Sequence, residues 1–232
     1  MLWALIAMAG FADAEAQGTP PSDGQPKVYV FAVTNVRPHV LQKMLETAMP
    51  GVGVTVYGRV GDFSRALEAS PPDAALAAAP VLSAFGQRPD VQGTKGGSAE
   101  EEYLLLSETA LAPDKLDALT IGCLDLVGRK GLPAFVASVL GISREPEIQR
   151  VTKTEDLLQL LQFKRADAVL IPEGSLGDLK TRTKMDFKIL RLPSAKVLRT
   201  AIAFPGNRQR VEGALRALPL AITAHLGVDR WQ

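Results

Sequence analysis

The order of segments along the chain constrains its fold more than any single motif does. Residues 27–34 (KVYVFAVT) form a β-branched and aromatic run that predicts a buried strand. An amphipathic pattern over residues 38–49, with Pro38 in the first turn, predicts a helix. Strand-like and helix-like segments continue to alternate as far as residue 80. Right-handed crossovers turn such a β-α-β-α-β order into a parallel sheet.

A second alternating set follows a polar, glycine-rich stretch at residues 86–102. A strand is expected at 102–107, between that stretch and the second set, and Thr152 to Glu155 has the form of a capping box before a helix. The other expected elements are strands at 118–125, 148–151, 166–172, 187–192 and 198–204, and helices at 132–141, 155–163, 175–182 and 211–226, the last with a kink at Pro219. The prediction is an α/β protein with two lobes, each a mostly parallel sheet flanked by helices.

The first residues are typical of a targeting segment. The apolar stretch at residues 2–10 is too short to span a bilayer, and Ala14-Glu15-Ala16 fits an A-x-A cleavage site. We therefore expect a signal peptide at residues 1–16 and a disordered leader at residues 17–26. This favours a protein secreted into a bacterial periplasm. No basic residue precedes the apolar stretch, and a membrane anchor is the alternative.

Composition excludes several classes of partner. The chain has 232 residues, 47% of them hydrophobic, so it is long enough to bury a sizeable core. Its formal net charge of +1 gives no basis for binding nucleic acid or an anionic membrane surface. Cys123, the only cysteine, lies in an apolar run and is expected in the core, because it has no intramolecular disulfide partner.

No arrangement of catalytic or metal-binding residues is visible in the sequence. The two histidines, His39 and His225, both fall in expected helices. There is no HExxH motif, no cysteine cluster and no GxSxG nucleophile elbow. We therefore expect no metal, no cofactor and no enzymatic activity.

Four stretches are similar to those of a known family. They are AVTN at 32–35 before the proline-initiated helix, PDAALAAAPVLSAFG at 72–86, the segment 101–131 from EEYLLLS to GRKG, and RADAVLIPEG at 165–174. In this layout the chain, over residues 27–232, resembles the type 2 periplasmic solute-binding proteins. Within them it resembles the phosphate, phosphite and phosphonate branch of the ABC-transporter binding proteins.

The resemblance implies a fold, a function and partners. The implied fold places residues 27–107 and 194–232 in lobe I and residues 108–193 in lobe II. Such a protein acts as a monomer that binds a small solute between lobes that close by hinge motion, and it hands the solute to an ABC permease or a membrane sensor. The implied solute is anionic or zwitterionic, either phosphonate- or phosphate-like or amino-acid-like. The alternative is a periplasmic accessory or sensor-partner protein with a degenerate cleft.

The glycine-bracketed turn Gly128-Arg129-Lys130-Gly131 is the most distinctive candidate in this cleft. The resemblance implies that it joins a strand of lobe II to a helix N-terminus, a position whose free N–H groups attract anions. The family's corresponding turn is rich in Ser and Thr, and here only Gly131 fits it. Arg129 would make a bidentate contact to a carboxylate or phosphate and Lys130 would add charge. The alternative is a tight turn that needs glycines and leaves both cations in solvent.

Other ligand-binding candidates follow from the same layout. Thr34 and Asn35 come directly after the first strand, where they would contact a ligand or form a turn. Ala79 and Pro80 follow the third strand and would offer backbone groups to a ligand. Glu173, after the strand at 166–172, would meet a ligand amine or cap the following helix.

Overall fold

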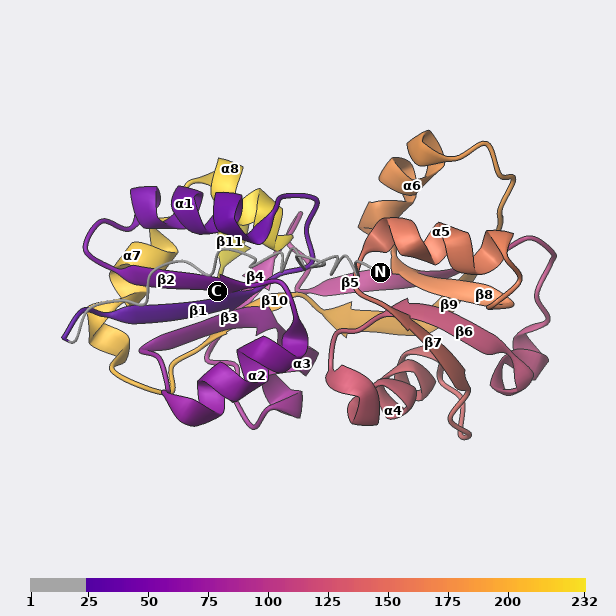
Figure 1. Cartoon of the computed structure of the whole chain (residues 1–232), viewed down its shortest axis with the longest axis horizontal. Coiled ribbons are helices and arrows are strands. Elements are labelled where there is room, and N and C mark those ends of the chain that lie inside the picture. The colour runs from indigo at the N-terminus through magenta and orange to yellow at the C-terminus, as the bar shows by residue number, and fades with distance from the viewer. Residues whose placement is uncertain (1–23) are drawn as a thin grey trace, which may run out of the picture.

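The computed structural model describes residues 24–232 and has two lobes side by side along its longest axis, each built around its own sheet (Figure 1). The first sheet has the strand order β11-β4-β10-β3-β1-β2 and the second has the order β7-β6-β8-β5-β9. The two-lobed α/β fold expected from the sequence is therefore confirmed. The expected signal peptide and most of the expected leader lie outside the described residues.

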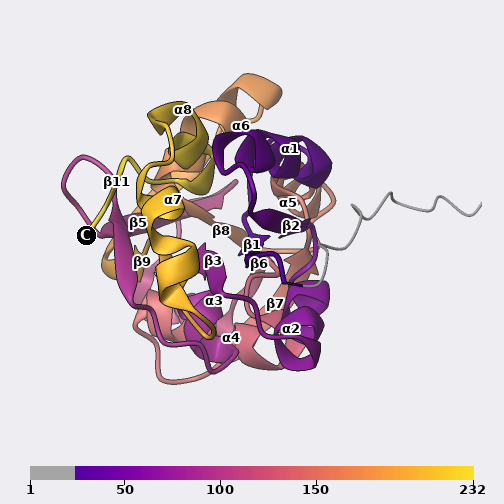
Figure 2. The same cartoon turned by 90° about the vertical axis from the view of Figure 1, so that its left-hand side faces the viewer.

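The first lobe contains the β-α-β-α-β unit expected from the sequence. Its elements are β1 (Lys27–Phe31), α1 (Pro38–Ala48), β2 (Gly53–Tyr57), α2 (Val60–Ala69), β3 (Ala74–Ala78) and α3 (Ala79–Ala84). Strand β1 pairs in parallel with both β2 and β3, as right-handed crossovers require. Seen from the end of the molecule, α1 and α8 (Leu220–Thr223) cover one face of the sheet, and α2 and α3 cover the other (Figure 2).

The C-terminal part of the chain returns to the first lobe, which periodicity could not reveal. Strand β10 (Thr200–Ala203) pairs antiparallel with β3 and β4 (Val91–Thr94), and β11 (Arg230–Trp231) completes the edge. The helix expected at 211–226 is instead interrupted, forming α7 (Glu212–Arg216) and α8. Pro219 lies between them in an extended conformation and ends the helix rather than kinking it.

The second lobe repeats the parallel arrangement and adds two strands, β5 and β9, through antiparallel pairings. Its elements are β5 (Glu100–Ser107), β6 (Thr120–Leu124), α4 (Gly128–Leu140), β7 (Glu147–Val151), α5 (Thr154–Gln162), β8 (Ala168–Pro172), α6 (Leu176–Arg182) and β9 (Lys188–Leu198). Strand β6 is parallel to β7 and β8, whereas β5 is antiparallel to β8 and β9.

The sheets divide the chain at different residues from those expected. Strand β5 pairs with β8 and β9, so residues 100–107 lie in the second sheet rather than in lobe I. Strand β9 extends to Leu198, although a strand was expected only to residue 192. Its alternation explains the extension, because Ala195 and Val197 are buried while Lys196 and Leu198 are exposed. The chain therefore crosses between the sheets near residues 99 and 199.

Two helix starts also differ from the sequence predictions. The capping box is absent, because α5 is preceded by Lys153 as its N-cap and no side chain caps it. Helix α4 begins at Gly128, four residues before the predicted start, and Gly128 has a φ of +79° that favours glycine. Within residues 24–232 no helix is long and apolar enough to cross a membrane.

Candidate functional site

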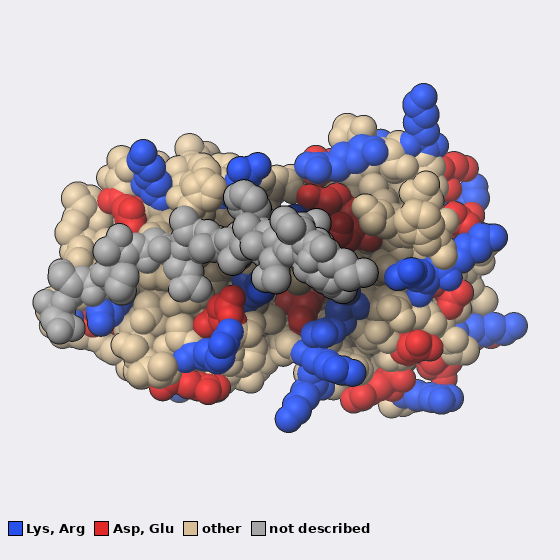
Figure 3. Space-filling model, in the orientation of Figure 1, with Lys and Arg blue, Asp and Glu red and all other residues tan. Residues whose placement is uncertain are grey.

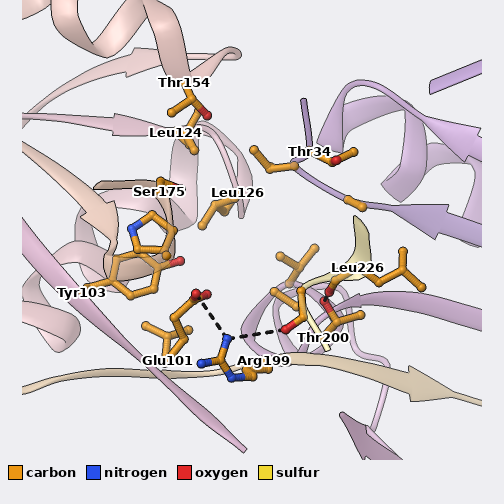
Figure 4. A pocket seen from close by; sticks show the side chains of 18 of the residues that line it. Thr34, Glu101, Tyr103, Leu124, Leu126, Thr154, Ser175, Arg199, Thr200 and Leu226 are labelled. Atoms are coloured by element: carbon orange, nitrogen blue, oxygen red, sulfur yellow. Dashed lines mark hydrogen bonds and ion pairs between the residues drawn. The ribbon is translucent and has the colours of Figure 1, made fainter. Parts of the chain in front are cut away.

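A cavity of about 470 Å³ lies between the lobes and is lined by both of them (Figure 4). Segments that follow β1, β6 and β8 contribute to its walls, because the carboxyl ends of parallel strands open into such a crevice. Its apolar lining includes Phe31, Val36, Val81, Leu124, Leu126, Phe135, Val197 and Leu226. Its polar lining includes Thr34, Asn35, Lys95, Glu101, Tyr103, Thr154, Ser175, Asp178, Arg199, Thr200 and His225.

An ion pair joins the two lobes at the base of the cavity. The Nη1 atom of Arg199 lies 3.2 Å from Oε1 of Glu101, and the two side chains are 13% and 26% exposed. Arg199 lies between β9 and β10, at the crossing between the sheets, and Glu101 belongs to β5. The same Nη1 also donates to the carbonyl of Gly227 in the first lobe, at 3.5 Å. This arginine is therefore held by both lobes.

Tyr103 contributes a protonated phenol next to this ion pair. Its side chain is buried in β5, and Figure 4 shows its hydroxyl directed into the cavity beside Glu101. Burial raises the pKa of Tyr103 well above its ordinary value, and the negative charge of Glu101 raises it further. The hydroxyl is therefore able to donate a hydrogen bond at any physiological pH.

Cys123, also in the cavity lining, should be unreactive in the folded protein. Burial raises the pKa of its thiol to about 12, and the nearby Asp125 adds to the effect. Because the thiolate is the nucleophile, alkylation by iodoacetamide at pH 8.5 should be at least about 100-fold slower than in the urea-unfolded chain, where the thiol pKa is near 8.5. Mass spectrometry of timed samples measures both rates. Equal rates in folded and unfolded protein would contradict the buried position.

One hydrogen bond connects the lobes on the opposite side of the cavity. Asn35, in the loop after β1, donates from Nδ2 to Oδ2 of Asp178 in α6, over 3.2 Å. The same carboxylate oxygen lies 3.1 Å from Nε of Arg182. Asn35 and Asp178 both line the cavity, so the structure has the lobes in contact across it.

The ligand-binding residues expected from the sequence fall in different places. Thr34 and Asn35 line the cavity. Ala79 and Pro80 begin α3 and are not among the lining residues, although the adjacent Ala78 is. Glu173 is also outside the lining, because its carboxylate pairs with Arg191 while the following residues 174 and 175 face the cavity.

The glycine-bracketed turn forms the first turn of α4, next to the cavity but outside its lining. Arg129 and Lys130 are exposed, whereas the lining residues nearest in sequence are Leu126 and Phe135. Gly128 has the left-handed backbone that a tight turn requires. An anion-binding role for residues 128–131 stays a prediction.

The ion pair at the base of the cavity was missed by sequence reasoning. By its composition alone the acidic run at 99–102 indicates a solvated approach to a strand. In the structure Glu100 and Glu102 are largely exposed, while Glu101 is half-buried and Tyr103 buried. This period-2 alternation was the available signal, since it places Glu101 and Tyr103 on one face of β5. Within residues 24–232 no group of His, Cys, Asp and Glu side chains is arranged to hold a metal ion.

Comparisons with known proteins place the fold. No protein-family model matches the chain, and no curated protein matches it. Among solved structures, XAC2383 from Xanthomonas citri bound to ATP is 14% identical with a TM-score of 0.61, over 89% of this chain and 90% of that one. A binding protein component of an ABC phosphonate transporter from Pseudomonas aeruginosa is 12% identical with a TM-score of 0.61, over 90% and 81%.

A third solved structure comes from an amino-acid transport system. AbpA from Streptococcus pneumoniae, an amino acid ABC transporter substrate-binding protein bound to L-arginine, is 13% identical with a TM-score of 0.57, over 88% of this chain and 92% of that one. The chain therefore has the two-lobed fold of the type 2 periplasmic binding proteins.

Proposed function

We propose that the protein is a periplasmic solute-binding protein of an ABC-type importer. The observation that supports this most is the cavity of about 470 Å³ between the lobes, lined by side chains of both. A cavity at the junction of two units joined by two crossing segments is suited to enclosing a small ligand by hinge motion. Its volume suits a metabolite rather than a macromolecule.

The proposed solute is small and anionic or zwitterionic, either phosphonate- or phosphate-like or amino-acid-like. Solved structures that share the fold include binding proteins for both classes, and this supports the range. An ABC permease is the proposed membrane partner, and the protein acts as a monomer in the periplasm. Basic and acidic side chains are interspersed on the face seen in Figure 3, which favours a small solute over a polyanion as partner.

We propose a binding rather than a catalytic role. Three of the cavity's charged residues, Glu101, Arg199 and Asp178, are engaged in ion pairs or hydrogen bonds. The cavity's thiol, Cys123, stays protonated and is therefore a poor nucleophile. This arrangement fits a site that holds a solute without changing it.

A thermal-shift screen of the purified full chain tests the proposal. The panel contains phosphate, sulfate, phosphonates, carboxylates and amino acids. A solute present at about 100 times its dissociation constant should stabilise the protein by about 2.7 kcal/mol and raise the Tm by about 5–11 °C. A reproducible shift with one chemical class is the expected result.

The opposite outcome is equally informative. If a cooperatively unfolding sample shows no shift with any member of the panel, the importer function is overturned. The alternative, an accessory or sensor-partner protein with a degenerate cleft, then takes its place.

A further inference from the structure

The charged groups of the cavity differ in how far the protein itself satisfies them. Arg199 donates to Glu101 and to Gly227, and its Nε has no hydrogen-bond partner but is fully buried, out of reach of a ligand. Asp178 accepts from Asn35 and pairs with Arg182. Lys95 is exposed beside the strand end of β4. Among the described residues Glu101 has one partner, Arg199, which it meets through Oε1.

The carboxylate of Glu101 therefore retains unused capacity to accept hydrogen bonds. Figure 4 shows it directed into the cavity from β5, with the hydroxyl of Tyr103 alongside. On one side the backbone of the second lobe closes over it, because a Cβ on Gly174 would lie 3.1 Å from its Oε1. The other side faces the cavity, and among the described residues Arg199 is the cation that pairs with this carboxylate.

The part of the cavity next to Glu101 and Arg199 is unfavourable for an anion. It would lie beside the Glu101 carboxylate, and the positive charge of Arg199 is already neutralised by that carboxylate. The Arg199 side chain is only 13% exposed, so it has little surface left for a second anionic partner. A cationic nitrogen can use the lone pairs of the Glu101 carboxylate that Arg199 leaves free, and the guanidinium beside it is already paired with that carboxylate.

We infer that the cavity binds a solute with an ammonium group, held by Glu101 and Tyr103, and with an apolar body. The body packs against Leu124, Leu126 and Phe135, which line the same cavity. Amines and zwitterions are therefore ligands, and simple anions such as phosphate are not. This inference rests on the proposed function and narrows its solute class to the amine-bearing members.

A matched set of three probes tests the inference: pentylamine, 5-aminovalerate and valerate, which share a five-carbon chain and differ in charge. Isothermal titration calorimetry of the full chain at pH 7 should detect binding of pentylamine and 5-aminovalerate, and none of valerate. Glu101→Gln should weaken amine binding about 10- to 100-fold, because a charge-assisted hydrogen bond is lost. It should also create weak affinity for valerate, since Arg199 is then unpaired.

Two further variants separate binding from folding. Glu102→Gln makes the same change on the next residue of β5, where the side chain is 53% exposed and pairs with Arg191 at 3.8 Å, so amine affinity should be unchanged. Tyr103→Phe removes only the hydroxyl and should weaken amine binding about 5- to 10-fold. If Glu101→Gln fails to fold, Tyr103→Phe still tests the amine site.

Three results would overturn the inference. Binding of valerate or phosphate by the unaltered protein, with no binding of either amine, would show that the solute is an anion and leave the importer function standing. Equal loss of amine affinity in the Glu101 and Glu102 variants would mean that the ammonium group does not bind at Glu101. No binding of any probe or of any solute in the wider panel would remove the importer function as well.

Discussion

Leu126→Trp should abolish solute binding while the protein stays folded. Leu126 is half-buried, follows β6, and points into the cavity in Figure 4. An indole at this position occupies the space that the solute's apolar body needs, so affinity should fall by about 100-fold or more, since overpacking of a closed site is costly. Calorimetry with the best solute of the thermal-shift panel measures the loss.

A matched substitution controls for the size of the new side chain. Phe163 is 65% exposed and lies in the second lobe away from the cavity lining, so Phe163→Trp should leave solute affinity unchanged. Circular dichroism should show the same secondary structure in both variants. If Leu126→Trp retained full affinity, the solute would bind outside this cavity.

Phe63→Ala should have the largest effect on stability. Phe63 is fully buried in α2 and packs against three other rings, those of Phe31, Tyr57 and Phe85, with centroid distances of 5.9, 5.9 and 6.5 Å. Removal of the ring leaves a cavity and ends these aromatic contacts, so the free energy of unfolding should fall by about 3–5 kcal/mol. Urea denaturation monitored by fluorescence measures the change.

The same truncation at an exposed phenylalanine provides the comparison. Phe163→Ala removes an equal ring from a residue in contact with solvent, and it should change stability by less than about 0.5 kcal/mol. Equal losses in the two variants would mean that α2 does not pack on the first sheet as described.

The core around Phe63 also explains how the lobes are connected. A single cluster of buried apolar residues runs from Phe31 and Phe63 in the first lobe, through Val81 and Val197, to Leu132 in the second. Two further clusters lie on the opposite faces of the two sheets, one for each lobe. The lobes are thus joined by continuous packing on one side, and on the other side they meet through Asn35 and Asp178.

Local sequence patterns predicted most of the fold. The β-branched run at 27–34 and the amphipathic pattern at 38–49 became β1 and α1. Parallel pairing of β1, β2 and β3 also follows from the order of elements. Weaker or shorter patterns were missed, among them β4 and β11, because these strands have only four and two residues and little apolar periodicity.

Candidate site residues were predictable only where they directly follow a strand. Thr34 and Asn35 line the cavity because β1 carries them to the carboxyl edge of the first sheet, a position that can be read from the order of elements. Arg199, Glu101 and Asp178 come from segments far apart in the sequence, and Arg199 meets Glu101 only because β5 and β9 pair. No local sequence pattern predicts that β5 pairs with β9.

The sequence by itself determined the two α/β units, their order and the residues at the ends of their parallel strands, because these depend on periodicity and short-range connections. Only the tertiary structure decided which strand crosses between the sheets, where the C-terminal segment returns, and which charges meet in the cavity. Those features depend on contacts between residues distant in the chain, such as Glu101 with Arg199 and Asn35 with Asp178. The chemistry of the cavity is therefore a property of the assembled lobes.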